Sequence, residues 1–96
     1  MIDKAITWCV VQDSDLLFEK WGAEVIVYNS LSGETHQIDD FSATVLEQLM
    51  RSHYTEEKLL RDICSLYSLE SNSENKQLIN RIINNFDQIG LIEPYY

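Results

Sequence analysis

The chain has 96 residues, of which 45% are hydrophobic, so it can build one modest hydrophobic core but not two domains. It carries 16 acidic and 7 basic residues, which gives a formal net charge of −9. Nucleic-acid-binding surfaces gain affinity from Lys and Arg that displace counterions, so this charge argues against nucleic acid and favours a neutral or basic peptide as partner.

The sequence also argues against membrane insertion and catalysis. No apolar run approaches the ~18 residues of a membrane span, and residues 1–4 lack the features of a signal peptide, so we expect a cytoplasmic protein without a membrane partner. Cys9 and Cys64 are too far apart in sequence for a metal pair, and we interpret both as reduced packing residues. No pattern of nucleophile and base, metal ligands or cofactor clamp occurs. We therefore predict no catalytic residues, no metal, no cofactor and no enzyme activity.

The first 40 residues are typical of short strands. Residues 5–11 form a β-branched and aromatic run, residues 16–21 are a second apolar segment, and residues 24–29 have strand composition. A short connection ending at Gly33 then lets residues 34–39 return antiparallel. Four aromatic residues of this half are interpreted first as core: Trp8, Phe18, Trp21 and Tyr28.

The strand expected over residues 34–39 is one-sided. His36 and Ile38 share one face, and polar residues occupy the other, so only one face resembles a core and His36 is read as a half-buried sheet residue. The pattern is helical from Phe41 onward, so no further strand follows directly. This strand is therefore a candidate open edge, which is a hazard in an ordinary domain and a binding device in a peptide carrier.

Three helices are expected after residue 40. Each has a polar residue placed to cap its N-terminus: Asp39 or Asp40, then Thr55, then Ser71 with Glu74. Each should bury one apolar stripe: Phe41, Val45, Leu46, Leu49 and Met50; Leu59, Leu60, Ile63, Leu66 and Tyr67; Leu78, Ile82, Phe86 and Ile89. Gly90 is placed to end the third helix, and residues 91–92 can return as a short closing strand.

The third helix carries more apolar residues than its stripe requires. Ile79 and Ile83 widen the apolar arc beside Lys76, Asn80 and Asp87. Two interpretations stay open, a broad core contact and the floor of a groove beside the open strand. The groove interpretation predicts that Ile83→Asp weakens peptide binding far more than it disturbs folding.

The expected order of short strands and three helices carries four distinctive features: Trp8, WGxE from Trp21, YNxxSGxTH over residues 28–36 and IGLI over residues 89–92. Together these features resemble the PqqD-like family. The resemblance covers nearly the whole chain, and YNxxSGxTH is most similar to the subgroup called HPr-rel-A system PqqD family peptide chaperones. The implied fold is α+β: a winged-helix-like domain with an N-terminal three-stranded antiparallel sheet followed by three helices.

The resemblance implies a RiPP recognition element. Such a domain binds the leader of a ribosomally made precursor peptide and presents the core to a partner, here a peptide-modifying enzyme or an HPr-kinase-like system protein. Family members hold the leader as a strand added to the third strand, beside the third helix. Carried over to this chain, the peptide-binding residues are Glu34, Thr35, His36, Gln37, Ile38 and Asp39 on the strand, and Lys76, Ile79, Asn80, Ile83 and Asp87 on the helix.

Two other functions remain alternatives. A winged-helix regulator would need a basic recognition helix, but the third helix sets Lys76 and Arg81 against Glu74 and Asp87. A structural domain would instead pair the open strand with its own copy in a homodimer.

Overall fold

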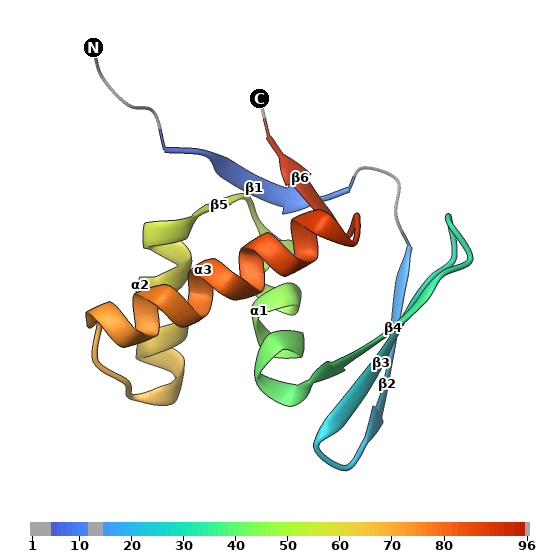
Figure 1. Ribbon diagram of the computed structural model, residues 1–96, viewed down its shortest axis with the longest axis horizontal. Helices are drawn as coiled ribbons and strands as arrows, with labels where there is room; N and C mark the ends of the chain where they lie inside the picture. Colours follow the sequence, from blue (N-terminus) through green and yellow to red (C-terminus); the bar gives the residue numbers. More distant parts are fainter. Residues whose placement is uncertain (1–4, 12–14, 96) are drawn as a thin grey trace.

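The strands before residue 40 and the helices after them form the predicted α+β fold. The computed structural model describes residues 5–11 and 15–95 (Figure 1). Strands β2 (Leu16–Trp21), β3 (Glu24–Asn29) and β4 (Thr35–Asp39) form an antiparallel sheet in that order. Helices α1 (Asp40–Arg51), α2 (Glu56–Tyr67) and α3 (Ser73–Gln88) follow. The prediction of a three-stranded antiparallel sheet followed by three helices is confirmed.

The N-terminal strand belongs to a second sheet. Strand β1 (Thr7–Val10) lies between β5 (Tyr54–Thr55) and β6 (Ile92–Pro94) and is antiparallel to both. Main-chain bonds extend this pairing, from Val11 N to Leu91 O (3.1 Å) and from Tyr95 N to Thr7 O (2.7 Å). The closing strand predicted at the chain end therefore exists, and β1 lies against it rather than beside β4 (Figure 1).

Side-chain caps set where the helices begin. Asp39 caps α1 by accepting from Ser42 N (2.7 Å), and Thr55 caps α2, as predicted. The predicted capping box at Ser71 is wrong, because α3 begins at Ser73 and Asn72 in extended conformation reaches the amide of Asn75 (2.9 Å). At its other end, α3 stops before Gly90, which has a φ of 78°.

The core lies between the inner face of the β2–β3–β4 sheet and the helices. Its least exposed side chains come from every layer and include Val27, Val45, Leu46, Leu59, Ile63, Phe86 and Leu91. Three residues assigned to buried stripes are instead exposed: Met50, Leu66 and Tyr67. The last turn of α2 extends past the core, so Tyr67 packs against Phe41 (5.1 Å between ring centroids) and donates to Thr44 Oγ1 (3.0 Å).

The prediction that four aromatic residues belong to the core is wrong for two of them. Trp8 is buried and Phe18 is partly buried, but Trp21 and Tyr28 are exposed on the opposite face of the sheet. Alternation explains this result, because Val25 and Val27 point into the core and their even-numbered neighbours on β3 point away from it.

Candidate functional site

Hydrogen bonds at both ends of the β3–β4 ladder show which main-chain groups of β4 face its neighbour. Asn29 N donates to Glu34 O (2.9 Å) before β4, and Asp40 N donates to Ala23 O (3.1 Å) after it. Bonded pairs in an antiparallel ladder recur at every second residue. The even-numbered residues of β4 therefore direct their main-chain N–H and C=O groups toward β3.

The odd-numbered residues of β4 direct their main-chain N–H and C=O groups away from the sheet. These are Thr35, Gln37 and Asp39, and no strand among residues 5–11 and 15–95 pairs with this side of β4. Strand β1, which could have covered this edge of β4, instead pairs with β6 in the other sheet. The predicted open edge thus exists. Thr35 and Gln37 offer main-chain donors and acceptors, whereas Asp39 offers only its N–H, because the C=O of an N-cap residue accepts the first bond of its helix.

The predicted strand residues have different surroundings. His36 is half-buried opposite Val27, and Ile38 belongs to the core, whereas Thr35 and Gln37 are exposed. Glu34 lies directly before β4, and its carbonyl already accepts from Asn29 N. The site is therefore a strip of main chain with exposed side chains on one face and a core-facing pair on the other.

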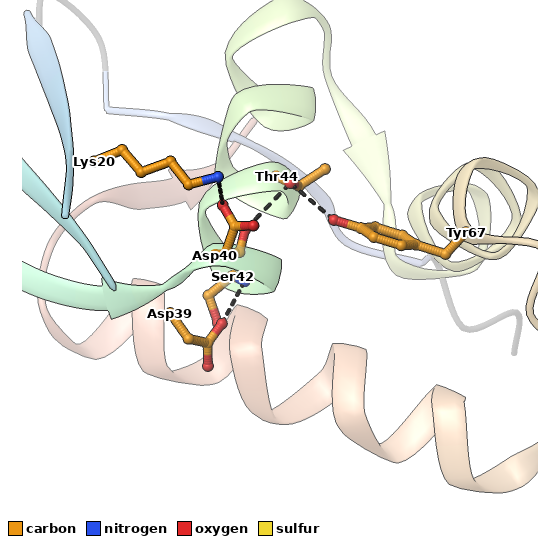
Figure 2. A network of polar contacts seen from close by, with 6 residues as sticks. All are labelled: Lys20, Asp39, Asp40, Ser42, Thr44 and Tyr67. Carbon is orange, nitrogen blue, oxygen red and sulfur yellow. Dashed lines mark hydrogen bonds and ion pairs between the residues drawn. The ribbon is translucent and has the colours of Figure 1, made fainter. Parts of the chain in front are cut away.

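Polar contacts fix the end of β4 where it enters α1. Figure 2 shows Asp39 bonded to Ser42 and Asp40 paired with Lys20 from β2 (3.3 Å). The side chain of Thr44 donates to Asp40 O (3.2 Å). The ion pair is well exposed and contributes little stability, at most about 1 kcal/mol. Together these contacts hold the strand against the helix that follows it.

Strand β2 is the other edge of the sheet, and no strand of residues 5–11 and 15–95 pairs with its outer side. Because β3 directs its odd-numbered residues to β4, its even-numbered residues bond to β2, and the register turns the main chain of Phe18 and Lys20 outward. Beside this edge is a hollow of about 350 Å³ lined by Phe18, Glu47, Met50 and Arg51. A lysine on an edge strand discourages pairing with a further strand. The edge of β4 has no charged residue before Asp39.

Of the two interpretations of the wide apolar arc on α3, the structure supports the core contact. Ile79 and Ile83 are each only 1% exposed and belong to the core, so the wide apolar arc is the broad core contact. Leu78 and Ile89 instead remain partly exposed at the margin of the core. Whether a peptide reaches Ile79 or Ile83 stays a prediction, and their side chains are covered in the free chain.

One flank of α3 faces α2 and β1. Lys76 and Asn80 line a hollow of about 830 Å³, and none of the residues lining it comes from β4. Asn80 Nδ2 donates to Glu56 Oε1 on α2 (2.9 Å). At 100° per residue, Leu78 and Ile89 lie on the opposite flank. Asp87 is exposed near the C-terminal end of the helix.

The two cysteines lie apart, Cys9 on β1 and Cys64 on α2. Cys9 is half-buried and its thiol contacts Glu93 O (3.6 Å); burial, followed by the charge of Glu93, raises the pKa of this thiol. The thiolate is thus disfavoured at neutral pH. Both cysteines are free, and the described residues contain no cluster of three or more His, Cys, Asp or Glu that could hold a metal ion. Within residues 5–11 and 15–95, the helices are too short or too polar to cross a membrane.

Two solved structures share this fold. The first is TbiB1 in complex with the TbiA(beta) leader peptide, with a TM-score of 0.67 and 15% sequence identity over 92% of this chain and 98% of that one. The second is a lasso peptide synthetase B1 complexed with the leader peptide, with a TM-score of 0.64 and 15% identity over 91% and 98%. No protein-family model and no curated protein matches the chain. The chain therefore has the fold of two leader-peptide-bound proteins, nearly end to end.

Proposed function

We propose that this chain is a non-catalytic leader-peptide-binding protein that adds the peptide as a strand to β4 and presents it to a modifying enzyme. One observation carries the proposal: Thr35 and Gln37 direct their main-chain N–H and C=O groups, and Asp39 its N–H, to an edge that no strand of residues 5–11 and 15–95 occupies. The shared fold with two leader-peptide-bound proteins supports it. The run YNxxSGxTH favours the HPr-rel-A subgroup, so a modifying enzyme or an HPr-kinase-like protein encoded nearby is the partner to test first.

Edge chemistry favours β4 over β2. A peptide added to β4 meets Thr35 and Gln37, which are uncharged and exposed, whereas β2 presents Glu19 and Lys20. Charged residues on an edge strand oppose the addition of a neighbour. Each new main-chain hydrogen bond contributes about 0.5–1.5 kcal/mol net, so several of them set the register of the peptide without fixing its sequence.

Side-chain burial would supply the remaining affinity. Alternate side chains of an added strand fall on the core-facing side, in line with His36 and Ile38. Partly buried Leu78 and Ile89 on α3 are the apolar residues that we propose to contact them. Each apolar side chain buried contributes roughly 1.5–3 kcal/mol before ordering costs. Two or three such side chains are compatible with micromolar affinity, and the net charge of −9 favours a neutral or basic leader.

Proline substitution distinguishes the two edges. Gln37→Pro removes an outward N–H that is not part of the β3–β4 ladder, so the sheet should survive while peptide addition is blocked. Lys20→Pro also removes an outward N–H, on the β2 edge, and is the control; it removes the exposed Lys20–Asp40 ion pair as well, which contributes little stability. Calorimetric titration with a leader peptide that binds the unsubstituted chain should show at least a tenfold loss of affinity for Gln37→Pro only. Thermal melts verify that both variants are folded. Unchanged affinity in a folded Gln37→Pro variant would reject the proposal.

A further inference from the structure

The outer face of the β2–β3–β4 sheet is a second surface that peptide addition at the edge does not explain. The strand register arranges its side chains in three cross-strand rows: Leu17, Tyr28 and Thr35; Glu19, Ile26 and Gln37; Trp21, Glu24 and Asp39. α1 packs on the other face of the sheet, and no helix among the described residues covers this one (Figure 1). We call this set of nine side chains the outer face.

The outer face carries a contiguous apolar band. Trp21 is 63% exposed, Leu17 56% and Tyr28 39%, and Ile26 lies half-buried between them. Cross-strand and diagonal neighbours on one face of a sheet lie within reach of each other, so these four side chains form one patch. A contiguous exposed apolar patch marks an interaction site, and Trp and Tyr are enriched among the residues that dominate binding at the centres of protein interfaces.

The charges around this band are of one sign. Glu19, Glu24 and Asp39 are acidic, and the nine side chains of the outer face include no Lys or Arg. Lys20 points to the opposite face and pairs with Asp40, so it does not neutralise them. A second copy of this chain would bring three further carboxylates against these three, which disfavours self-association. Basic groups around an apolar centre are the complementary surface.

We propose that the outer face docks a protein partner whose contact surface is apolar at its centre and lined by Lys and Arg at its rim. Trp21, Leu17 and Tyr28 supply the apolar anchors, and Glu19 and Glu24 select for a basic rim. The apolar anchors and the two glutamates lie on β2 and β3, whereas the outer face shares only Thr35, Gln37 and Asp39 with the main-chain edge of β4.

Two synthetic helical peptides with the same Leu and Trp stripe test the proposal, one flanked by Lys and the other by Glu. Each is titrated into the full-length, ¹⁵N-labelled chain. The Lys-flanked peptide should bind at least tenfold more tightly, weaken as salt is added, and shift the amide signals of β2 and β3 most. Equal affinity for both peptides would overturn the proposal, as would shifts centred on the hollow between α2 and α3.

Variants separate the outer face from general acidity. The double variant Leu17→Ser with Trp21→Ser keeps every charge, and the double variant Glu19→Gln with Glu24→Gln keeps every apolar side chain. Each double variant should lower the affinity for the Lys-flanked peptide at least fivefold. Leu66→Ser is the matched control, because it removes a leucine of similar exposure (57%) from α2. An equal loss in the control would overturn the proposal. Two other results would also overturn the proposal: dimerisation in sedimentation, or binding to zwitterionic lipid vesicles, if either disappears when Leu17 and Trp21 are replaced by Ser.

Discussion

Replacing Ile83 on α3 tests whether its side chain belongs to the core or lines a groove. Its side chain is 1% exposed and lies in the same core as Phe86 and Leu91. Ile83→Ala deletes buried carbon atoms and leaves a cavity, at a cost of about 2–5 kcal/mol. A chain of this length has a free energy of unfolding of roughly 5–14 kcal/mol. The variant should therefore still fold, with a loss of about 3 kcal/mol and a melting temperature lower by about 12–24 °C.

Urea unfolding followed by far-UV circular dichroism measures this loss. Gln77→Ala is the control on the same helix, because Gln77 is exposed and its replacement should change stability by no more than about 0.5 kcal/mol. Ile83→Asp should not fold, because it places a carboxylate in the core without a partner. This reverses the expectation from sequence that Ile83→Asp would spare folding. A loss below about 1 kcal/mol for Ile83→Ala would refute the core assignment.

Three further predictions concern local features of the fold. Asp39→Ala removes the cap of α1 and should lower the free energy of unfolding by about 1 kcal/mol in urea; no change would contradict the cap. Gly90→Ala should cost about 1 kcal/mol in the same assay through left-handed strain alone, because no atom lies within 4 Å of the added Cβ. Burial of the phenol, followed by its hydrogen bond with Asp62 and the charge of that residue, raises the pKa of Tyr54. Tyr54 therefore keeps its proton in the folded chain at pH values above about 10, where the unfolded chain releases it. Stability should fall from that pH through the folded pKa, and Tyr54→Phe should flatten the fall; parallel profiles would contradict it.

Local signals in the sequence predicted much of the fold. Caps such as Thr55, the stop at Gly90 and the alternation in residues 34–39 depend on neighbouring residues, and these predictions are confirmed. The partner of β1 depends on contacts across the whole chain, so its pairing with β6 had no local signal.

Ambiguous patterns account for the errors. Residues 25–28 are apolar on both faces of β3, so the sequence could not say that Val27 points inward and Tyr28 outward. A wide apolar arc on a helix is equally compatible with a deep core or a groove, and only the packing of α3 places Ile79 and Ile83 in the core. Side-chain alternation also does not reveal which main-chain groups are hydrogen-bonded. Only the hydrogen bonds between β3 and β4 show that the odd-numbered residues of β4 direct their main-chain groups outward.

Amide hydrogen exchange of β4 tests the central claim most directly. Without peptide, the amides of His36 and Ile38 should exchange slowly because they bond to β3, and those of Thr35 and Gln37 should exchange fast. Saturation with the leader peptide should slow Thr35 and Gln37 at least tenfold and leave Phe18 and Lys20 on β2 unchanged. Slowing confined to Phe18 and Lys20, or peptide binding that leaves Thr35 and Gln37 fast, would contradict strand addition at β4.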